Sequence, residues 1–144
     1  QLAVAAGARV IGTASEANHD FLRSLGAEAV TYGPGLAERV RALAPDGVTA
    51  ATDLWSDEVV HAAIELGVAP ERISTIVYGN ALPAGVKSTG GINATPGALD
   101  RIAGALAART VVLPIEARFT IDQIRDAVEL QRGGHVRGKV VITF

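Results

Sequence analysis

The stretch Arg9-Val10-Ile11-Gly12-Thr13-Ala14-Ser15 is typical of a buried β-strand that runs into a polar loop. Residues 1–6 before it resemble the end of a helix, which Gly7 and Ala8 close. A helical pattern over residues 17–25 follows the loop directly. A strand between two helices, with short connections on both sides, favours an α/β fold.

The same alternation continues along the whole chain. It predicts strands at residues 9–14, 29–32, 48–55, 73–78 and 86–89, with helices at residues 17–25, 36–44, 57–66 and 96–108. Extended segments at 111–115 and 117–119 are separated by Pro114, and a capped helix from Thr120 and a final strand at 138–144 follow. We therefore expect one doubly wound domain over residues 1–144, with a mostly parallel sheet and helices on both faces.

The beginning of the chain suggests that the expected fold is incomplete. In a Rossmann-like, dinucleotide-binding sheet, residues 9–14 correspond to the second strand. The first strand and its glycine-rich phosphate turn are then expected before Gln1, outside this sequence.

Composition excludes several classes of function. Hydrophobic residues make up 49% of the chain with few aromatics, which suits a core of small aliphatic side chains. The net charge of −2 leaves no basic footprint for nucleic acid. No apolar run is long enough for a membrane span. The absence of cysteine is consistent with a cytoplasmic location and provides no thiolate for a metal.

The loop after the first strand carries the most informative polar residues. In dinucleotide sites this turn meets the adenosine ribose, where a carboxylate at the strand end binds the 2′-hydroxyl of NAD. Here the strand end carries Thr13 and Ser15, and small hydroxyls leave room for a 2′-phosphate. Ser15, Asn18 and a protonated His19 could donate to that phosphate, which predicts NADP(H). Alternatively, Ser15 caps the next helix, and both roles are compatible.

The later strand ends predict the opposite side of the cofactor site. Asp53 ends one strand, either as a catalytic carboxylate or, as we favour, by bonding to backbone. After the strand from residue 73, backbone contacts to the nicotinamide are expected from Ile76, Val77 and Gly79. Gly90 and Gly91 would permit close backbone approach, or form an ordinary turn.

Other chemistries are not supported by motifs. The chain has no nucleophile elbow, no Walker-type loop and no histidine pair with metal-ligand spacing. No residue is identified as a catalytic acid or base, and no metal is predicted.

Two segments resemble the cofactor domain of medium-chain dehydrogenases/reductases, and most of all their zinc-independent quinone oxidoreductase group. The first contains Gly7-Ala8-Arg9-Val10-Ile11-Gly12-Thr13-Ala14-Ser15 and Leu22-Arg23-Ser24-Leu25-Gly26-Ala27-Glu28. The second is the ending Gly134-His135-Val136-Arg137-Gly138-Lys139-Val140-Val141-Ile142. The resemblance covers essentially the whole chain.

This resemblance implies NADPH-dependent reduction of quinones or enones by hydride transfer. It also implies an N-terminal, GroES-like catalytic domain that is absent here, towards which a closing segment at 109–144 would pack. The group often has lysine where this chain has His19, and a tyrosine one position later than Tyr32. It places Tyr32 and Lys139 near the cofactor.

Two alternatives to this assignment remain open. The chain could be a non-catalytic α/β module that oligomerises, since the resemblance implies a homodimer through the strand Val86–Thr89. It could also belong to a relative of the zinc alcohol dehydrogenases, whose zinc ligands would mostly lie upstream. In each case we expect the isolated chain to be a poor catalyst.

Overall fold

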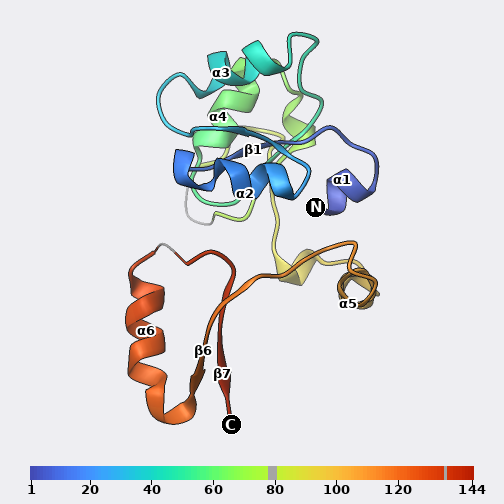
Figure 1. Cartoon of the computed structure of the whole chain (residues 1–144). Helices are drawn as coiled ribbons and strands as arrows, with labels where there is room; N and C mark the ends of the chain where they lie inside the picture. The colour runs from blue at the N-terminus through green and yellow to red at the C-terminus, as the bar shows by residue number, and fades with distance from the viewer. Residues whose placement is uncertain (78–80, 135) are drawn as a thin grey trace. The chain divides into compact units, whose positions relative to one another are not determined.

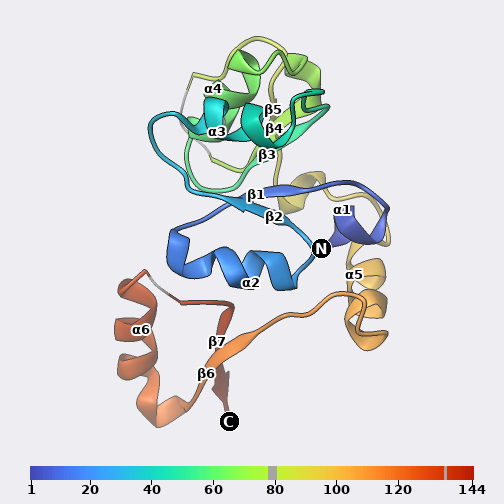
Figure 2. The ribbon, with the colours of Figure 1, turned by 45° about the horizontal axis from the view of Figure 1, so that its top comes forward.

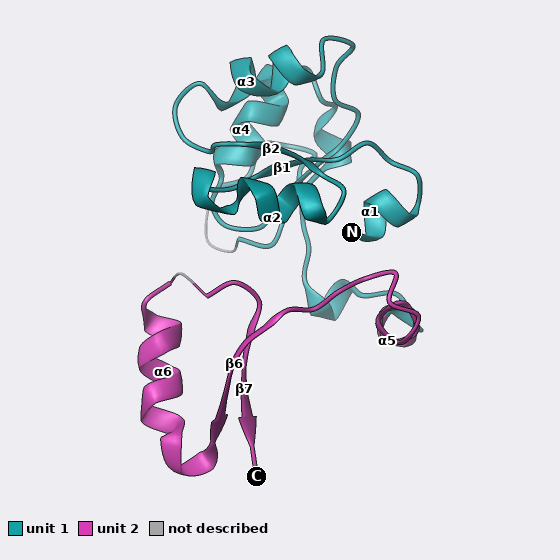
Figure 3. Cartoon of the chain, in the orientation of Figure 1, with its two compact units in different colours: residues 1–98 teal, residues 99–144 magenta. Residues whose placement is uncertain are grey.

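The computed structural model describes residues 1–77, 81–134 and 136–144 (Figure 1). The chain forms two compact units, residues 1–98 and 99–144, coloured separately in Figure 3. The closing segment expected at 109–144 lies within the second unit.

The first unit alternates short strands and helices. Its elements are α1 (Leu2–Ala5), β1 (Ile11–Thr13), η1 (Glu16–Asn18), α2 (His19–Ser24), β2 (Glu28–Val30), α3 (Leu36–Leu43), β3 (Ala51–Asp53), α4 (Glu58–Glu65), η2 (Pro70–Arg72), β4 (Ile73–Thr75), β5 (Lys87–Ser88) and η3 (Gly91–Asn93). This order confirms the predicted α/β alternation.

All strand pairs of the first unit are parallel over the described residues. β1 pairs with β2, and β3, β4 and β5 form a second sheet in that order (Figure 2). Thr13 at the end of β1 pairs with Val30 at the end of β2, and Asp53 at the end of β3 pairs with Thr75 at the end of β4. The paired parallel strands therefore end at the same edge. The structure thus confirms a Rossmann-like α/β fold with parallel sheets, although its ladders form separate groups rather than one continuous sheet.

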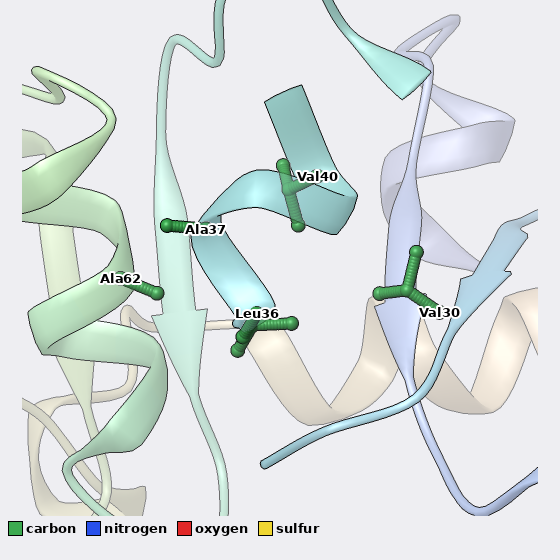
Figure 4. Close-up of a cluster of buried hydrophobic side chains, with 5 residues drawn as sticks. All are labelled: Val30, Leu36, Ala37, Val40 and Ala62. Carbon is green, nitrogen blue, oxygen red and sulfur yellow. The ribbon is translucent and has the colours of Figure 1, made fainter. Parts of the chain in front are cut away.

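Two apolar clusters join these sheets through shared helices. Val30, Leu36, Ala37, Val40 and Ala62 form the first cluster (Figure 4). Val60, Ala63, Val68 and Ile73 form the second. Helix α4 contributes to both, because its buried residues at successive positions face the α3 side and the β4 side. Burying each valine, leucine or isoleucine of these clusters contributes about 1.5–3 kcal/mol.

The starts of β1 and β2 are linked by an ion pair. Arg9 Nη2 donates to Glu28 Oε2 at 3.0 Å and to the Leu43 carbonyl at 2.7 Å. The hydrogen bond from Arg9 holds the pKa of the Glu28 carboxyl below its usual value, and the same bond raises the pKa of Arg9. Both side chains are exposed, so the pair contributes little to stability.

Replacing Arg9 with glutamine is expected to raise the pKa of Glu28 towards its ordinary value of 4.5. A carboxyl with a lowered pKa in the folded state stabilises the fold above its unfolded pKa. That contribution is lost as the pH falls through the lower, folded pKa. Titration of the Glu28 side-chain carbon by NMR measures the shift directly. Arg23→Gln, which removes the partner of Asp20 instead, should leave the Glu28 midpoint unchanged; an unchanged midpoint in Arg9→Gln would contradict the pairing.

The second unit contains most of α5 (Ala98–Ala107), β6 (Ile115–Thr120), η4 (Ile121–Gln123), α6 (Ile124–Arg132) and β7 (Lys139–Thr143). β6 and β7 are parallel, with a register shift between Ile115 and Ala117. Helix α6 contacts both strands (Figure 1). The predicted capping box is confirmed, since Gln123 Oε1 accepts from the Thr120 amide at 3.0 Å.

Several predicted strands and helices are longer than the observed ones. The strand expected at 48–55 is ordered as a ladder only at 51–53, and the helix expected at 17–25 begins with the 3-10 turn η1. A ladder extends only as far as its partner, and β4 offers β3 three paired positions. Of the two extended segments expected around Pro114, residues 111–114 form no strand, and β6 begins directly after the proline. Within the described residues, no helix combines the length and apolarity that crossing a bilayer requires.

Candidate functional site

The carboxyl ends of β1 and β2 bring two polar loops together. The Ala14 amide donates to the Val30 carbonyl at 3.0 Å, one position beyond the last paired residue of β1. The loop that starts at Ala14 and the turn that starts at Thr31 therefore begin side by side. This is the edge at which open α/β sheets bind ligands.

Three of the predicted residues form a small polar cluster in the first of these loops. The side-chain Nδ2 of Asn18 donates to Ser15 Oγ at 3.3 Å, and the backbone N–H of Asn18 donates to the Ser15 carbonyl at 2.8 Å. His19 Nε2 lies 3.3 Å from the Ala14 carbonyl, which can only accept, so this ring nitrogen is the donor. All three residues are half-buried, whereas Thr13 at the end of β1 is exposed. Ser15, Asn18 and His19 thus lie in one loop, and their role towards a phosphate stays a prediction.

Ser15 also occupies the helix-capping position that was the alternative to a ligand role. It is the N-cap residue of η1, but its side chain makes no capping bond to the helix backbone. Its Oγ instead accepts from Asn18. The hydroxyl hydrogen of Ser15 is thereby left to point elsewhere, which suits a donor to a ligand.

The turn after β2 carries Tyr32 and is held by two helices. Tyr32 is 55% exposed, so its ring is accessible to a ligand. The Arg39 side chain from α3 donates to the carbonyls of the turn, including Tyr32 at 3.2 Å and Gly33 at 2.8 Å. Glu58 from α4 accepts from the Gly33 amide. Gly33 and Gly35 both have positive φ, as the predicted Gly-Pro-Gly turn requires.

A buried network joins the ends of β3 and β4. Asp53 and Thr75 are each 1% exposed, and Thr75 Oγ1 donates to Asp53 Oδ2 at 2.8 Å. Thr75 Oγ1 in turn accepts from the Val77 amide at 2.9 Å, and Asp53 Oδ1 accepts from the Ser56 amide at 3.3 Å. The Ile76 amide donates to the Asp53 carbonyl at 3.1 Å. Asp53 therefore bonds to backbone and holds the loop that starts at Ile76, which is the role we favoured for it.

The remaining predicted residues lie in three places. Ile76 is 42% exposed and Val77 is half-buried, directly after β4. Gly90 follows β5 with an extended backbone, and a Cβ on Gly91 would meet no atom within 4 Å. Gly79 lies outside the described residues. Lys139 is exposed at the start of β7 in the second unit.

Sequence reasoning missed the residues that support the site. Arg39, Glu58 and Thr75 were not singled out, yet each fixes a loop at the carboxyl edge. The available signal was positional: Thr75 ends β4, opposite Asp53 at the end of β3. Arg39 offered no comparable signal, because its bonds all go to backbone carbonyls.

Comparison with known proteins shows the family to which the chain belongs. A family model described as zinc-binding dehydrogenase matches residues 24–142, so the chain belongs to that family. Its structural neighbours place it in the medium-chain dehydrogenase/reductase superfamily and match the cofactor-binding part of those proteins. A search of the curated proteins finds no match.

Three solved structures illustrate the likeness. A protein of Sinorhizobium meliloti 1021, named provisionally as an alcohol dehydrogenase, is 27% identical over 100% of this chain and 46% of its own, with a TM-score of 0.77. The quinone oxidoreductase from Coxiella burnetii is 24% identical over 99% of this chain and 47% of its own, with a TM-score of 0.67. The enoyl reductase CurK is 20% identical over 99% of this chain and 49% of its own, with a TM-score of 0.73. The chain thus spans about half the length of these proteins; the last two likenesses concern the fold alone.

The family description raises the question of a zinc site. Among the described residues, no group of three or more His, Cys, Asp or Glu side chains is placed to hold a metal ion. The sequence has no cysteine. The described part of the chain therefore does not supply a set of zinc ligands.

Proposed function

We propose that this chain is the cofactor-binding part of an NADPH-dependent oxidoreductase that reduces quinones or activated alkenes. The main support is the polar cluster at the end of β1. Ser15, Asn18 and His19 provide hydroxyl, amide and imidazole donors where an NAD-binding site would have a carboxylate. These groups suit a phosphate dianion better than a ribose 2′-hydroxyl.

The loops after β1 and β2 and the loop after β4 would bind opposite ends of the cofactor. The loops after β1 and β2 would hold the adenosine end, with Tyr32 exposed at the same sheet edge. The loop after β4 would hold the nicotinamide end, with its backbone fixed through Thr75 and Asp53. The bound nicotinamide supplies the hydride, and the residues of this chain bind and orient it.

NADPH is expected to bind this chain more tightly than NADH, and His19→Gln should remove most of the difference. A protonated imidazole makes a charge-assisted hydrogen bond to the 2′-phosphate, and losing such a contact weakens binding roughly tenfold. Glutamine can still donate to the Ala14 carbonyl, so the loop should keep its shape. Isothermal titration calorimetry with each cofactor measures both affinities.

His61→Gln is the matched control for this experiment. His61 is an exposed histidine on α4, where its Nε2 lies 3.8 Å from Asp57 Oδ2. Its replacement should leave both affinities unchanged. Equal binding of NADPH and NADH by the wild type would refute the NADP preference, and no binding of either cofactor would favour a non-catalytic module. Turnover of a quinone and enone panel by the full-length protein tests the substrate class.

The edge of the three-stranded sheet favours a homodimer. Among the residues that the structure describes, β5 is the last strand in its sheet, and both Lys87 and Ser88 are exposed. An unpaired parallel edge can pair with its twin across a two-fold axis. We therefore propose that the dimer forms through the segment Val86–Thr89. The oligomeric state of a Ser88→Pro variant, measured by analytical sedimentation, tests this proposal.

A zinc-type alcohol dehydrogenase is the second candidate. The family description and the named alcohol dehydrogenases among the structural neighbours favour it. Such a protein would oxidise alcohols with its zinc held outside the residues described here. Metal analysis of the full-length protein, together with assays on alcohols, separates it from the first candidate.

A further inference from the structure

The side chain of Arg39 makes hydrogen bonds to one short turn, residues 31–34. Its Nε donates to the Thr31 carbonyl at 2.9 Å and its Nη1 to the Pro34 carbonyl at 2.8 Å. Its Nη2 donates to the carbonyls of Tyr32 at 3.2 Å and Gly33 at 2.8 Å. One guanidinium thus binds four consecutive carbonyls. A lysine could not do so, because its single ammonium cannot spread donors over such a span.

The same turn is anchored from a second helix. Glu58 Oε1 from α4 accepts from the Gly33 amide, so Gly33 is held at both its amide and its carbonyl. Gly35 makes room for the guanidinium, because a Cβ there would lie 3.2 Å from Arg39 Nη1. Helices α3 and α4 pack in the first apolar cluster. The Arg39–Glu58 clamp therefore ties the turn to the core.

The clamped turn leaves the sheet at the same edge as the loop after β1. Thr13 pairs with Val30, so Ser15 and Tyr32 each lie two residues beyond that pair at the same edge. The clamp fixes the backbone of Tyr32 while leaving its side chain 55% exposed. Arg39 has used four of its five donors on carbonyls, so it is a positioning residue rather than a phosphate ligand.

We propose that the Arg39–Glu58 clamp holds the backbone of Tyr32 at the same sheet edge as Ser15, and that this preformed turn selects a 2′-phosphorylated adenosine. The proposal rests on the proposed function, since it concerns the same adenosine edge. The preference for a 2′-phosphate would then depend on a preformed turn as well as on the groups that donate hydrogen bonds to the phosphate. Preorganisation raises affinity because less ordering is left to occur on binding.

The test compares two fragments of the cofactors, 2′,5′-ADP and 5′-AMP, by calorimetry on the whole chain. Wild type is expected to prefer 2′,5′-ADP. Arg39→Gln should lower that preference roughly tenfold, the scale of one lost hydrogen-bonded contact, mostly through weaker 2′,5′-ADP binding. Arg39→Lys keeps the positive charge but should not restore the preference, because it cannot rebuild the four bonds.

Two further measurements separate the clamp from a general structural effect. Arg41→Gln removes an exposed cation from the same helix, near Glu65 at 3.8 Å, and should leave the preference unchanged. Hydrogen exchange at the Gly33 amide should accelerate in Arg39→Gln, since the turn is released. A purely structural loss would instead weaken both fragments equally, and that result would overturn the proposal.

The remaining outcomes are equally distinct. If wild type prefers 2′,5′-ADP and Arg39→Gln keeps that preference, the clamp is refuted while the NADP-binding function stands. Full restoration by Arg39→Lys would assign the effect to charge and refute the clamp. If wild type shows no preference at all, both the proposed NADP specificity and the clamp proposal fail.

Discussion

Replacing Asp53 with alanine is expected to lower the free energy of unfolding of the first unit by about 2–4 kcal/mol, from a lost hydrogen bond to a charged group plus a small cavity. The side chain is 1% exposed, so its hydrogen bonds are shielded from solvent. Thr75 Oγ1 and the Ser56 amide would both lose their acceptor. Thr75 would then be free to rotate, and the Val77 amide that it accepts from would lose its fixed partner.

Urea denaturation followed by circular dichroism measures this loss. Asp20→Ala is the matched control, because the Asp20 carboxylate is 97% exposed and pairs only across one helical turn with Arg23. Such a surface pair contributes about 0–1 kcal/mol, so the control should stay close to wild type. Asp53→Ala within that same range would show that the buried network does not stabilise the fold.

A double-mutant cycle with Thr75→Val resolves the pair itself. Valine keeps the shape of threonine without its hydroxyl, so the single change leaves Asp53 Oδ2 unpaired. Residues in direct contact usually show a coupling of about 0.5–3 kcal/mol, which we expect here. Additive effects would mean that the hydrogen bond contributes nothing beyond the two separate side chains.

The parallel α/β fold could be predicted because its signals are local. Residues 9–15 combine an apolar run with a polar end, and that run alone places β1 and the loop after it. The Gly33-Pro34-Gly35 turn was equally readable, because only glycine adopts positive φ at little cost. Strand ends were less predictable, since the extent of a ladder depends on a partner distant in sequence.

The polar cluster of the candidate site could be predicted because its residues follow one strand. Ser15, Asn18 and His19 lie within one loop, so their proximity follows from the sequence. Arg39 could not be recognised in this way. It lies in an amphipathic helix where an arginine is ordinarily solvated, and its four acceptors come together only once the turn has folded.

Gly138→Ala is expected to destabilise the second unit by about 3 kcal/mol or more, through backbone strain together with a steric clash. Gly138 has φ +107°, a conformation that costs an L-residue about 1–2 kcal/mol even in open space. A Cβ at this position would lie 2.3 Å from the Pro114 carbonyl oxygen. That oxygen cannot move away freely, because it accepts from the Lys139 amide at 2.9 Å where β7 begins.

Gly134→Ala isolates the clash from the strain. Gly134 also has a positive φ, +71°, but a Cβ there would meet no atom within 4 Å. Its replacement should therefore cost only the conformational strain of about 1–2 kcal/mol. Hydrogen exchange at the β6 and β7 amides reports on this unit separately from the first. Equal effects of the two alanines would contradict the clash with Pro114. A larger effect at Gly138 would show that the close approach of two backbones, at the point where Lys139 begins β7, requires glycine.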